Sequence, residues 1–314
     1  MSLQKDVEAL CRFPTRAVGS AGHQAARAYL VERFAELGLA PYAGDSYEVA
    51  YGPAQELLVN VVGEVRGEDP ALAPLLIGAH YDTVPTTPGA DDNAASVAIA
   101  LAVAGRLTAS PTRRSVVIAH FDAEEPPRFH TPMMGSTRFV AEQMAEPVHA
   151  AIVLDLVGHS LTVPGFEALV AVMGTESHPR LAEVVGEANG HSLGVVTLPN
   201  RMSPDLSDHY AFRIAQHPYL FLTGGEGRHY HAPTDTPDTL DYDKMAKLVD
   251  LVEELVRRIA AVPLGRAAEH DTAEQDTANL RRLLGPAAAA SLGLRGSGDF
   301  ERAMAALIGR IRGV

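Results

Sequence analysis

The feature that most constrains the fold is an apolar run that ends in a histidine and a carboxylate two residues apart. Residues 75–77 are apolar and lead into His80 and Asp82. A short loop rich in proline and glycine then presents the acid pair Asp91 and Asp92 just before an alanine-rich stretch that predicts a helix. In α/β proteins, reactive groups gather just past the carboxyl ends of parallel strands. The pattern therefore predicts such a sheet, with functional groups along one edge.

The rest of the chain alternates predicted strands and helices. Apolar runs predict strands at 114–121 and 150–156, and amphipathic spacing predicts helices at 19–39 and 243–260. This alternation is typical of a mostly parallel sheet enclosed by helices. We therefore expect an α/β fold: a three-layer α/β/α sandwich with a mixed, mostly parallel central sheet.

A change in composition near residue 263 predicts the domain organisation. Residues 1–262 are expected to form the main domain. A Pro- and Gly-containing acidic linker follows, and then two short predicted helices at 277–284 and 299–311. We interpret 263–314 as a linker and a helical C-terminal appendage. It would pack on the main domain or on a second copy of the chain. Packing on a second copy would make the protein a homo-oligomer.

Composition excludes several classes of partner. The formal net charge is −13, and no Lys/Arg stripe offsets the repulsion from nucleic acid or an anionic membrane. No apolar run reaches the roughly 18 residues that a membrane-spanning helix needs. The start of the chain lacks the apolar core of a signal peptide, so we expect a cytoplasmic protein, with a removed leader left open. The single cysteine, Cys11, rules out an internal disulfide and is expected in the core.

Further acids and histidines follow other predicted strand ends. Glu124 and Glu125 come after a buried strand and before two prolines, which stop regular structure. Asp155 ends another apolar run, and His229 and His231 follow the last core strand. Adjacent glutamates are common on surfaces. At a strand end, however, neighbouring carboxylates repel each other unless a cation or a proton lies between them, which favours a binding site.

The residue types indicate the chemistry. Two histidines and three carboxylates from separate strand ends, without sulfur, suit zinc, with manganese or cobalt as substitutes. Five ligands are too many for one catalytic zinc ion. They suit two ions that share a bridging carboxylate and a bridging water. A spare glutamate beside a ligand then serves as general base. We therefore expect two zinc ions (Zn2+).

Taken in order, these motifs resemble the co-catalytic zinc aminopeptidases, which include the bacterial leucyl aminopeptidases and, as relatives, the glutaminyl cyclases. The resemblance covers about residues 5–262, and the order of the motifs makes it specific. The motifs are His80-x-Asp82, Gly89-Ala90-Asp91-Asp92-Asn93, Glu124-Glu125, Asp155, Ser207-Asp208-His209, and His231 with Asp235-Thr236. Pro126-Pro127 after the two glutamates marks a subgroup form.

The resemblance implies the metal ligands. His80 would bind one zinc ion and His231 the other, while Asp91 would bridge the two. Glu125 would join the ion at His231, and Asp155 the ion at His80.

The resemblance also implies two catalytic residues that are not ligands. Glu124 would take the proton from the bridging water and pass it to the leaving amine. Asp82 would hydrogen-bond His80 and fix the orientation of its ring. In relatives, the peptide that corresponds to Asp91–Asp92 is cis.

Two assignments stay open at this point. Some relatives place a tyrosine that stabilises the transition state just upstream of Ser-Asp-His, and this chain has none there. Arg201, His209, Tyr210 and His229 are candidates for that role. His229 is also an alternative ligand to His231. We favour His231 because it directly precedes the Ala-Pro-Thr-Asp-Thr stretch.

The resemblance implies an aminopeptidase, which removes residues from peptides with a free N-terminus. One alternative is a glutaminyl cyclase-like acyltransferase, although such enzymes commonly line their pocket with tryptophan and this chain has none. Another is an aminoacylase- or carboxypeptidase-like amidohydrolase, although the gap between Asp155 and His231 is too short for the lid domain of those enzymes. A third is a non-catalytic binding domain on the peptidase fold. Such domains tend to lose ligands that this chain keeps.

Overall fold

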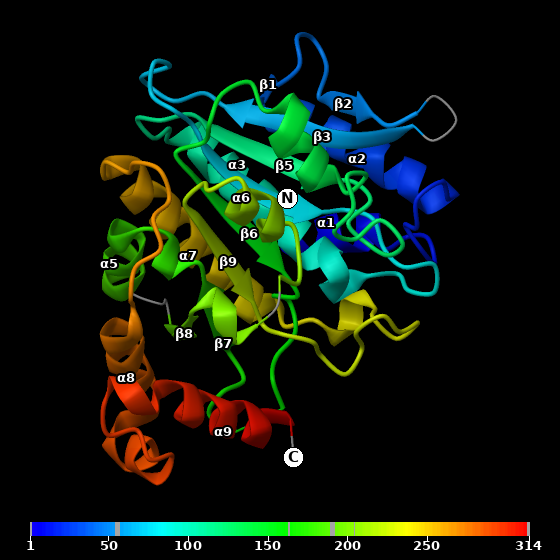
Figure 1. The fold of residues 1–314 in the computed structure, drawn as a ribbon. Coiled ribbons are helices and arrows are strands. Elements are labelled where there is room, and N and C mark those ends of the chain that lie inside the picture. Colours follow the sequence, from blue (N-terminus) through cyan, green and yellow to red (C-terminus); the bar gives the residue numbers. More distant parts are fainter. Residues whose placement is uncertain (1, 54–56, 163, 189–191, 204, 313–314) are drawn as a thin grey trace.

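The computed structural model describes residues 2–53, 57–162, 164–188, 192–203 and 205–312. Within these ranges nine strands form one sheet in the order β1-β3-β5-β4-β6-β9-β7-β8, with β2 also paired to β3 (Figure 1). The strands are β1 (Ala40–Pro41), β2 (Glu48–Tyr51), β3 (Leu58–Val65), β4 (Leu75–His80), β5 (Val116–Phe121), β6 (Ala150–Asp155), β7 (Leu169–Met173), β8 (Gly194–Leu198) and β9 (Tyr219–Thr223).

Helices cover both faces of this sheet. The α-helices are α1 (Leu3–Leu10), α2 (Ala21–Glu36), α3 (Ala95–Ala109), α4 (Gly135–Arg138), α5 (Pro179–Glu187), α6 (His209–Ile214), α7 (Tyr242–Ala261), α8 (Ala273–Ser291) and α9 (Phe300–Arg312). Two π-helical turns, η1 (Ala90–Ala94) and η2 (Phe139–Gln143), adjoin α3 and α4. One apolar core joins α1, α2, α3, α5 and α7 to one face, and a second joins η2 and α6 to the other. The predicted three-layer sandwich is confirmed.

The central strands bring the predicted site residues to one edge. Strands β5, β4, β6 and β9 are parallel neighbours, whereas β3 and β7 flank them in antiparallel pairing. Every residue of β4, β5 and β6 is buried, as expected for strands covered on both faces. His80 pairs with Phe121 in the register of β4 and β5. The loops that follow these strands therefore start at the same level of the sheet.

Packing of helix α7 positions the helical layer beneath the site. Its amphipathic sequence places Met245, Leu248, Val252 and Leu255 at 0% exposure, and the helix packs against the alanine-rich α3. Burying each such side chain stabilises the fold by about 1.5–3 kcal/mol. Because α3 follows directly from η1, this packing also fixes the turn that carries Asp91 and Asp92.

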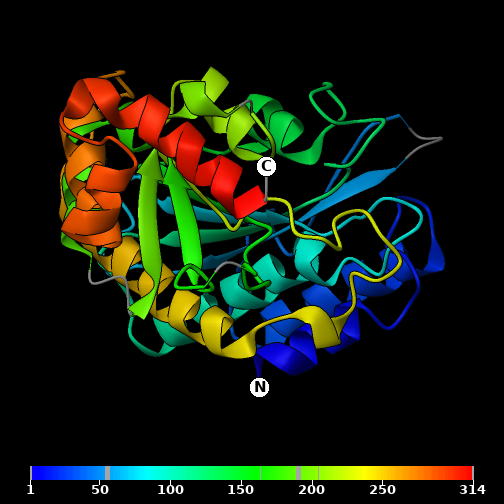
Figure 2. The same cartoon turned by 90° about the horizontal axis from the view of Figure 1, so that it is seen from below.

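Helices α8 and α9 fall in the range predicted as a C-terminal appendage and lie at the β7–β8 end of the sheet (Figures 1 and 2). Leu280, Phe300 and Met304 share a third apolar cluster with Leu169 of β7 and Val196 of β8. Helices α8 and α9 thus share an apolar cluster with strands of the same chain. Among the helices of the described ranges, none has the length and apolarity required to cross a membrane.

Candidate metal centre and active site

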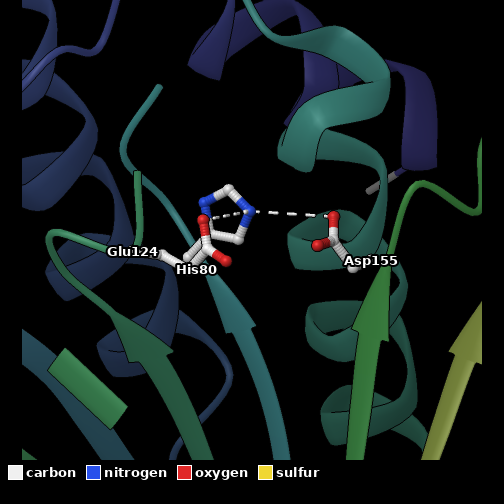
Figure 3. A group of neighbouring side chains, drawn as sticks. All are labelled: His80, Glu124 and Asp155. Atoms are coloured by element: carbon white, nitrogen blue, oxygen red, sulfur yellow. Dashed lines mark ion pairs between the residues drawn. The ribbon is translucent and has the colours of Figure 1, made fainter. Parts of the chain in front are cut away.

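The first group of site residues lies at the carboxyl ends of β4, β5 and β6. His80 ends β4, Asp155 ends β6, and Glu124 stands in the loop after β5 (Figure 3). The Nε2 atom of His80 is 3.7 Å from Oδ1 of Asp155 and 3.8 Å from Oε2 of Glu124. These three side chains are buried, with potential ligand atoms within 4.8 Å of one another.

The second group joins the loop after β5 to the long loop after β9. His231 lies in that long loop, and its Nε2 atom is 3.2 Å from Oε2 of Glu125 and 3.2 Å from Oδ2 of Asp92. The potential ligand atoms of these three residues also lie within 4.8 Å of one another. His229, the alternative ligand, instead contacts the hydroxyl of Thr234 at 2.8 Å. The structure therefore brings His231, and not His229, to the carboxylates.

Asp92 connects the two groups. Its Oδ1 atom is 3.3 Å from Nε2 of His80, while its Oδ2 atom is 3.2 Å from Nε2 of His231. One carboxylate thus faces a histidine of each group with a different oxygen. This is the position that the sequence analysis had given to Asp91.

Asp91 is the one predicted ligand that the structure does not bring into this set. Its Oδ1 atom accepts hydrogen bonds from the backbone N–H groups of Gly158 and His159, and its Oδ2 atom is 2.6 Å from Nδ1 of His159. The side chain therefore points toward the loop after β6, and its oxygens are occupied there. The cis peptide also lies one residue later than expected, between Asp92 and Asn93.

Asp82 anchors the loop that carries both glutamates. Its two carboxylate oxygens accept hydrogen bonds from the backbone N–H groups of Glu124 and Glu125, at 3.0 and 3.1 Å. Its Oδ1 atom is also 3.5 Å from Nδ1 of His80, in ion-pair range. Asp82 therefore contacts the predicted partner, but its hydrogen bonds fix the backbone of the two glutamates.

The unpaired atoms of the two groups fit a metal ion. Buried polar atoms in native proteins nearly always have hydrogen-bond partners. Several buried atoms here have no well-aligned partner among the described residues: Nδ1 and Nε2 of His80, Oε1 of Glu125, Oδ1 of Asp155 and Nε2 of His231. Imidazole nitrogens and carboxylate oxygens are the donor set that zinc takes in catalytic sites.

The electrostatics of the metal-free groups also indicate an excess of negative charge. Burial, with the neighbouring Asp92, raises the pKa of Glu125 to about 7. Contacts with Asp92 and Glu125 raise the pKa of His231 to about 10. Burial raises the pKa of Glu124 well above its usual range, in spite of the nearby His80. Crowded carboxylates that bind protons this tightly are a favourable setting for a divalent cation.

Asp208, from the Ser-Asp-His motif, adds a further acid beside these groups. Its side chain is fully buried, and burial raises its pKa to about 7. Its charge also contributes to the raised pKa of Glu124. His209 lies nearby but stacks on Phe221 at 4.0 Å, and burial lowers its pKa to about 3, so it is neutral.

The structure offers a residue that the sequence analysis missed for the role left open there. The ring of Tyr230 stacks on that of His231 with centroids 3.8 Å apart. Burial, followed by the charges of Asp92, Glu125, Asp155 and Glu124, raises the pKa of Tyr230. A tyrosine directly before the ligand histidine was the signal in the sequence.

The four residues that the sequence suggested for stabilising the transition state contact other parts of the chain. Arg201 forms an ion pair with Glu301 of α9 at 3.0 Å, and Tyr210 stacks on His130 at 4.2 Å. His209 and His229 have the partners described above. None of these contacts joins the candidate to a predicted metal ligand.

Comparison with known proteins identifies relatives of this chain. Residues 60–256 match the model of peptidase family M28. Uncharacterized protein YfbL of Escherichia coli (strain K12) is 30% identical, over 73% of this chain and 78% of that protein. Endoplasmic reticulum metallopeptidase 1 of Mus musculus is 27% identical over 65% of this chain, which spans only 22% of that protein's length.

Solved structures share the fold. LapB from Legionella pneumophila has a TM-score of 0.69 at 20% identity, over 83% of this chain and 72% of that one. A glutaminyl cyclase from Porphyromonas gingivalis has a TM-score of 0.66 at 21% identity, over 81% of this chain and 96% of that one. A Zn-dependent exopeptidase from Parabacteroides distasonis has a TM-score of 0.66 at 18% identity, over 82% of this chain and 97% of that one.

These findings identify the class of the protein as a metallopeptidase. More particularly, the chain belongs to peptidase family M28. The predicted relation to the zinc aminopeptidases and glutaminyl cyclases is thereby confirmed.

Proposed function

We propose that this peptidase is an aminopeptidase that works with two zinc ions. His80 and Asp155 would hold one ion, His231 and Glu125 would hold the other, and Asp92 would bridge them. The observation that carries the proposal is the position of Asp92, whose two carboxylate oxygens face the two histidines at 3.3 and 3.2 Å. A carboxylate shared in this way is typical of co-catalytic metal sites.

The bound metal would polarise the scissile carbonyl and make a water molecule nucleophilic at neutral pH. Glu124 is the proton carrier in this proposal. Its carboxylate lies 3.8 Å from His80 and is 5% exposed, and its backbone is held by Asp82. A buried carboxylate with a raised pKa accepts a proton readily. Oε2 of Glu124 would take the proton from the attacking water and return it to the nitrogen of the leaving amine.

Tyr230 completes the proposed site. Its hydroxyl would donate a hydrogen bond to the carbonyl oxygen as negative charge develops there. The stack on His231 would hold the ring close to the second metal group. The surplus of carboxylates around the ligands would favour a substrate with a positively charged, free N-terminus.

A panel of aminoacyl anilides, free and N-acetylated, tests this function before and after chelation and zinc restoration. We expect the zinc-loaded enzyme to cleave only the free-amine substrates. Chelation should abolish the cleavage and zinc should restore it. Counting the zinc ions per chain in the active preparation tests the stoichiometry separately.

The other outcomes distinguish the alternatives. Cleavage of the acetylated compounds would indicate an aminoacylase-like enzyme. Cyclisation of an N-terminal glutamine without hydrolysis would indicate a glutaminyl cyclase. Full metal loading with neither reaction, on free or acetylated substrates, would contradict the proposal and favour a binding role.

A further inference from the structure

Three buried aspartates hold the ligand-bearing loops to one another. Each accepts hydrogen bonds from two consecutive backbone N–H groups of a different loop. The pairs are Asp82 with Glu124 and Glu125, Asp91 with Gly158 and His159, and Asp235 with Asp91 and Asp92. Each acid thus comes from one segment of the site and fixes another.

Asp235 makes the connection of longest range among the three. It lies four residues after His231 and is 1% exposed. Its Oδ1 atom accepts from Asp91 N at 2.8 Å, and its Oδ2 atom accepts from Asp92 N at 3.1 Å. The backbone carbonyl of Asp235 also accepts from Ala90 N at 3.2 Å. Three successive N–H groups of η1 therefore point to this one residue.

The same residue also organises the turn that carries His231. The N–H of Asp235 donates to the carbonyl of Ala232, and the N–H of Ala232 donates to the carbonyl of His229. His231 itself has a positive φ of 54° within this turn. Asp235 therefore lies where the His231 turn meets the Asp92 turn, and it belongs to the hydrogen bonding of both.

The two metal groups depend on this junction to different degrees. His80 and Asp155 stand on strand ends, so the ladder of the sheet sets their separation. Asp92 and His231 stand on irregular segments. Charge-assisted hydrogen bonds are the strong ones among such contacts, and Asp235 supplies two of them between these segments. Without its carboxylate, the two segments lose both of these side-chain hydrogen bonds.

We infer that Asp235 is a positioning residue for the second metal group, formed by Asp92, Glu125 and His231. This inference rests on the proposed two-zinc function. Loss of the carboxylate should weaken binding of the ion at His231 about 10–100-fold, the range typical of residues that orient metal ligands. The ion at His80 and Asp155 should lose less affinity, because only the bridging Asp92 among its proposed ligands depends on Asp235, while His80 and Asp155 keep their strand positions.

Asp235→Asn tests the inference, because the amide keeps the size of the side chain but replaces one acceptor oxygen with a donor. The matched control is Asp238→Asn, the same change three residues later on an exposed acid that bonds only to Thr236 among the described residues. His231→Ala serves as a reference for loss of the second ion. Zinc is titrated against a competing chromophoric chelator to obtain both dissociation constants, with unfolding of the metal-free proteins followed in parallel.

Asp235→Asn should resemble His231→Ala in weakening the site at His231 much more than the site at His80. Asp238→Asn should have the same two zinc dissociation constants as the wild type. Unchanged affinities in Asp235→Asn would overturn the inference, as would equal weakening of both sites together with a much less stable metal-free fold. If the wild-type chain itself binds only one zinc ion, the two-zinc function fails instead.

Hydrogen exchange on the wild-type chain gives a check that needs no variant to fold. The amides of Asp91 and Asp92 should exchange slowly with and without zinc, because Asp235 accepts both of them in the folded chain. Exchange at the rate of free amides in both states would overturn the inference.

Discussion

Two adjacent aspartates in one turn have different partners because their side chains leave the backbone in different directions. Asp92 faces His80 and His231, whereas Asp91 faces Gly158 and His159. Asp92 has the non-helical angles φ −112° and ψ 85° within η1. Those angles decide which carboxylate faces the site. A sequence pattern gives the acid pair but not these angles, and the sequence-based choice of Asp91 fell one residue before the aspartate that faces both histidines.

The other candidate ligands could be predicted because each follows a pattern that is visible in the sequence. His80, Glu125 and Asp155 follow buried apolar runs, and the ends of parallel strands meet at one edge. Asp235 could not be assigned a role in this way. Its partners are backbone N–H groups far away in the sequence, which leave no mark in the side-chain pattern.

At the residue scale, Glu124→Gln should lower kcat by about 10²–10⁴-fold, because the amide cannot carry the proton. Zinc content should stay at the wild-type level, since Glu124 is not among the proposed ligands. Steady-state kinetics and metal analysis on the same preparation measure both. Glu142→Gln, on an exposed side chain, is the control. Wild-type kcat in Glu124→Gln would exclude this residue as the general base.

Tyr230→Phe keeps the stacked ring and removes only the hydroxyl. Loss of one donor to a developing oxyanion typically lowers kcat by about 10²–10³-fold, and we expect KM to change little. Tyr210→Phe is the matched comparison, because Tyr210 was a candidate in the sequence and instead stacks on His130. If Tyr210→Phe proves the more damaging of the two, the assignment to Tyr230 is wrong.

At the scale of elements, most boundaries followed from the sequence. The helix predicted at 243–260 is Tyr242–Ala261, and the strand predicted at 150–156 is Ala150–Asp155. The helix predicted at 277–284 is longer, Ala273–Ser291. In the structure Gly285 takes a φ of 72° and the chain resumes a helical path after this kink, and Ala289 beyond it belongs to the same apolar cluster as Val196 of β8.

The short helix α4 depends on a close approach at its first residue. A Cβ atom on Gly135 would lie 2.3 Å from the carbonyl oxygen of Asp122 and 2.4 Å from Oδ1 of Asn60. Gly135→Ala should therefore destabilise the fold by about 1–3 kcal/mol, as overpacking typically does. Urea unfolding of the metal-free protein measures the change. In Gly298→Ala the added Cβ meets no atom within 4 Å. Its free energy of unfolding should equal that of the wild type within error.

At the scale of the whole molecule, the C-terminal helices complete the core at one end of the sheet. Phe300 is 1% exposed and shares a cluster with Leu169 and Val196 of the main domain. We therefore propose that 263–314 is a supporting appendage of the domain 1–262. In this arrangement its apolar side is occupied by the same chain.

Phe300→Ala should lower the free energy of unfolding by about 3–5 kcal/mol, the usual cost of truncating a buried aromatic side chain. The value of kcat/KM under stabilising conditions should stay close to the wild type, because the change lies at the β7–β8 end. Arg302→Ala, on an exposed side chain of the same helix, is the control. An equal loss of stability in both variants would contradict a packing role for Phe300.

The hydrogen bond from Asp91 to Asp235 spans 144 positions of the chain, and this separation has a consequence for biosynthesis. Contacts of such long range form late, after the loops between them have been closed. A nascent chain that has not yet reached residue 235 lacks both His231 and the carboxylate that holds Asp92. On the proposed assignment, a growing or truncated polypeptide therefore cannot cleave its neighbours, and hydrolytic competence arises only when the fold is complete.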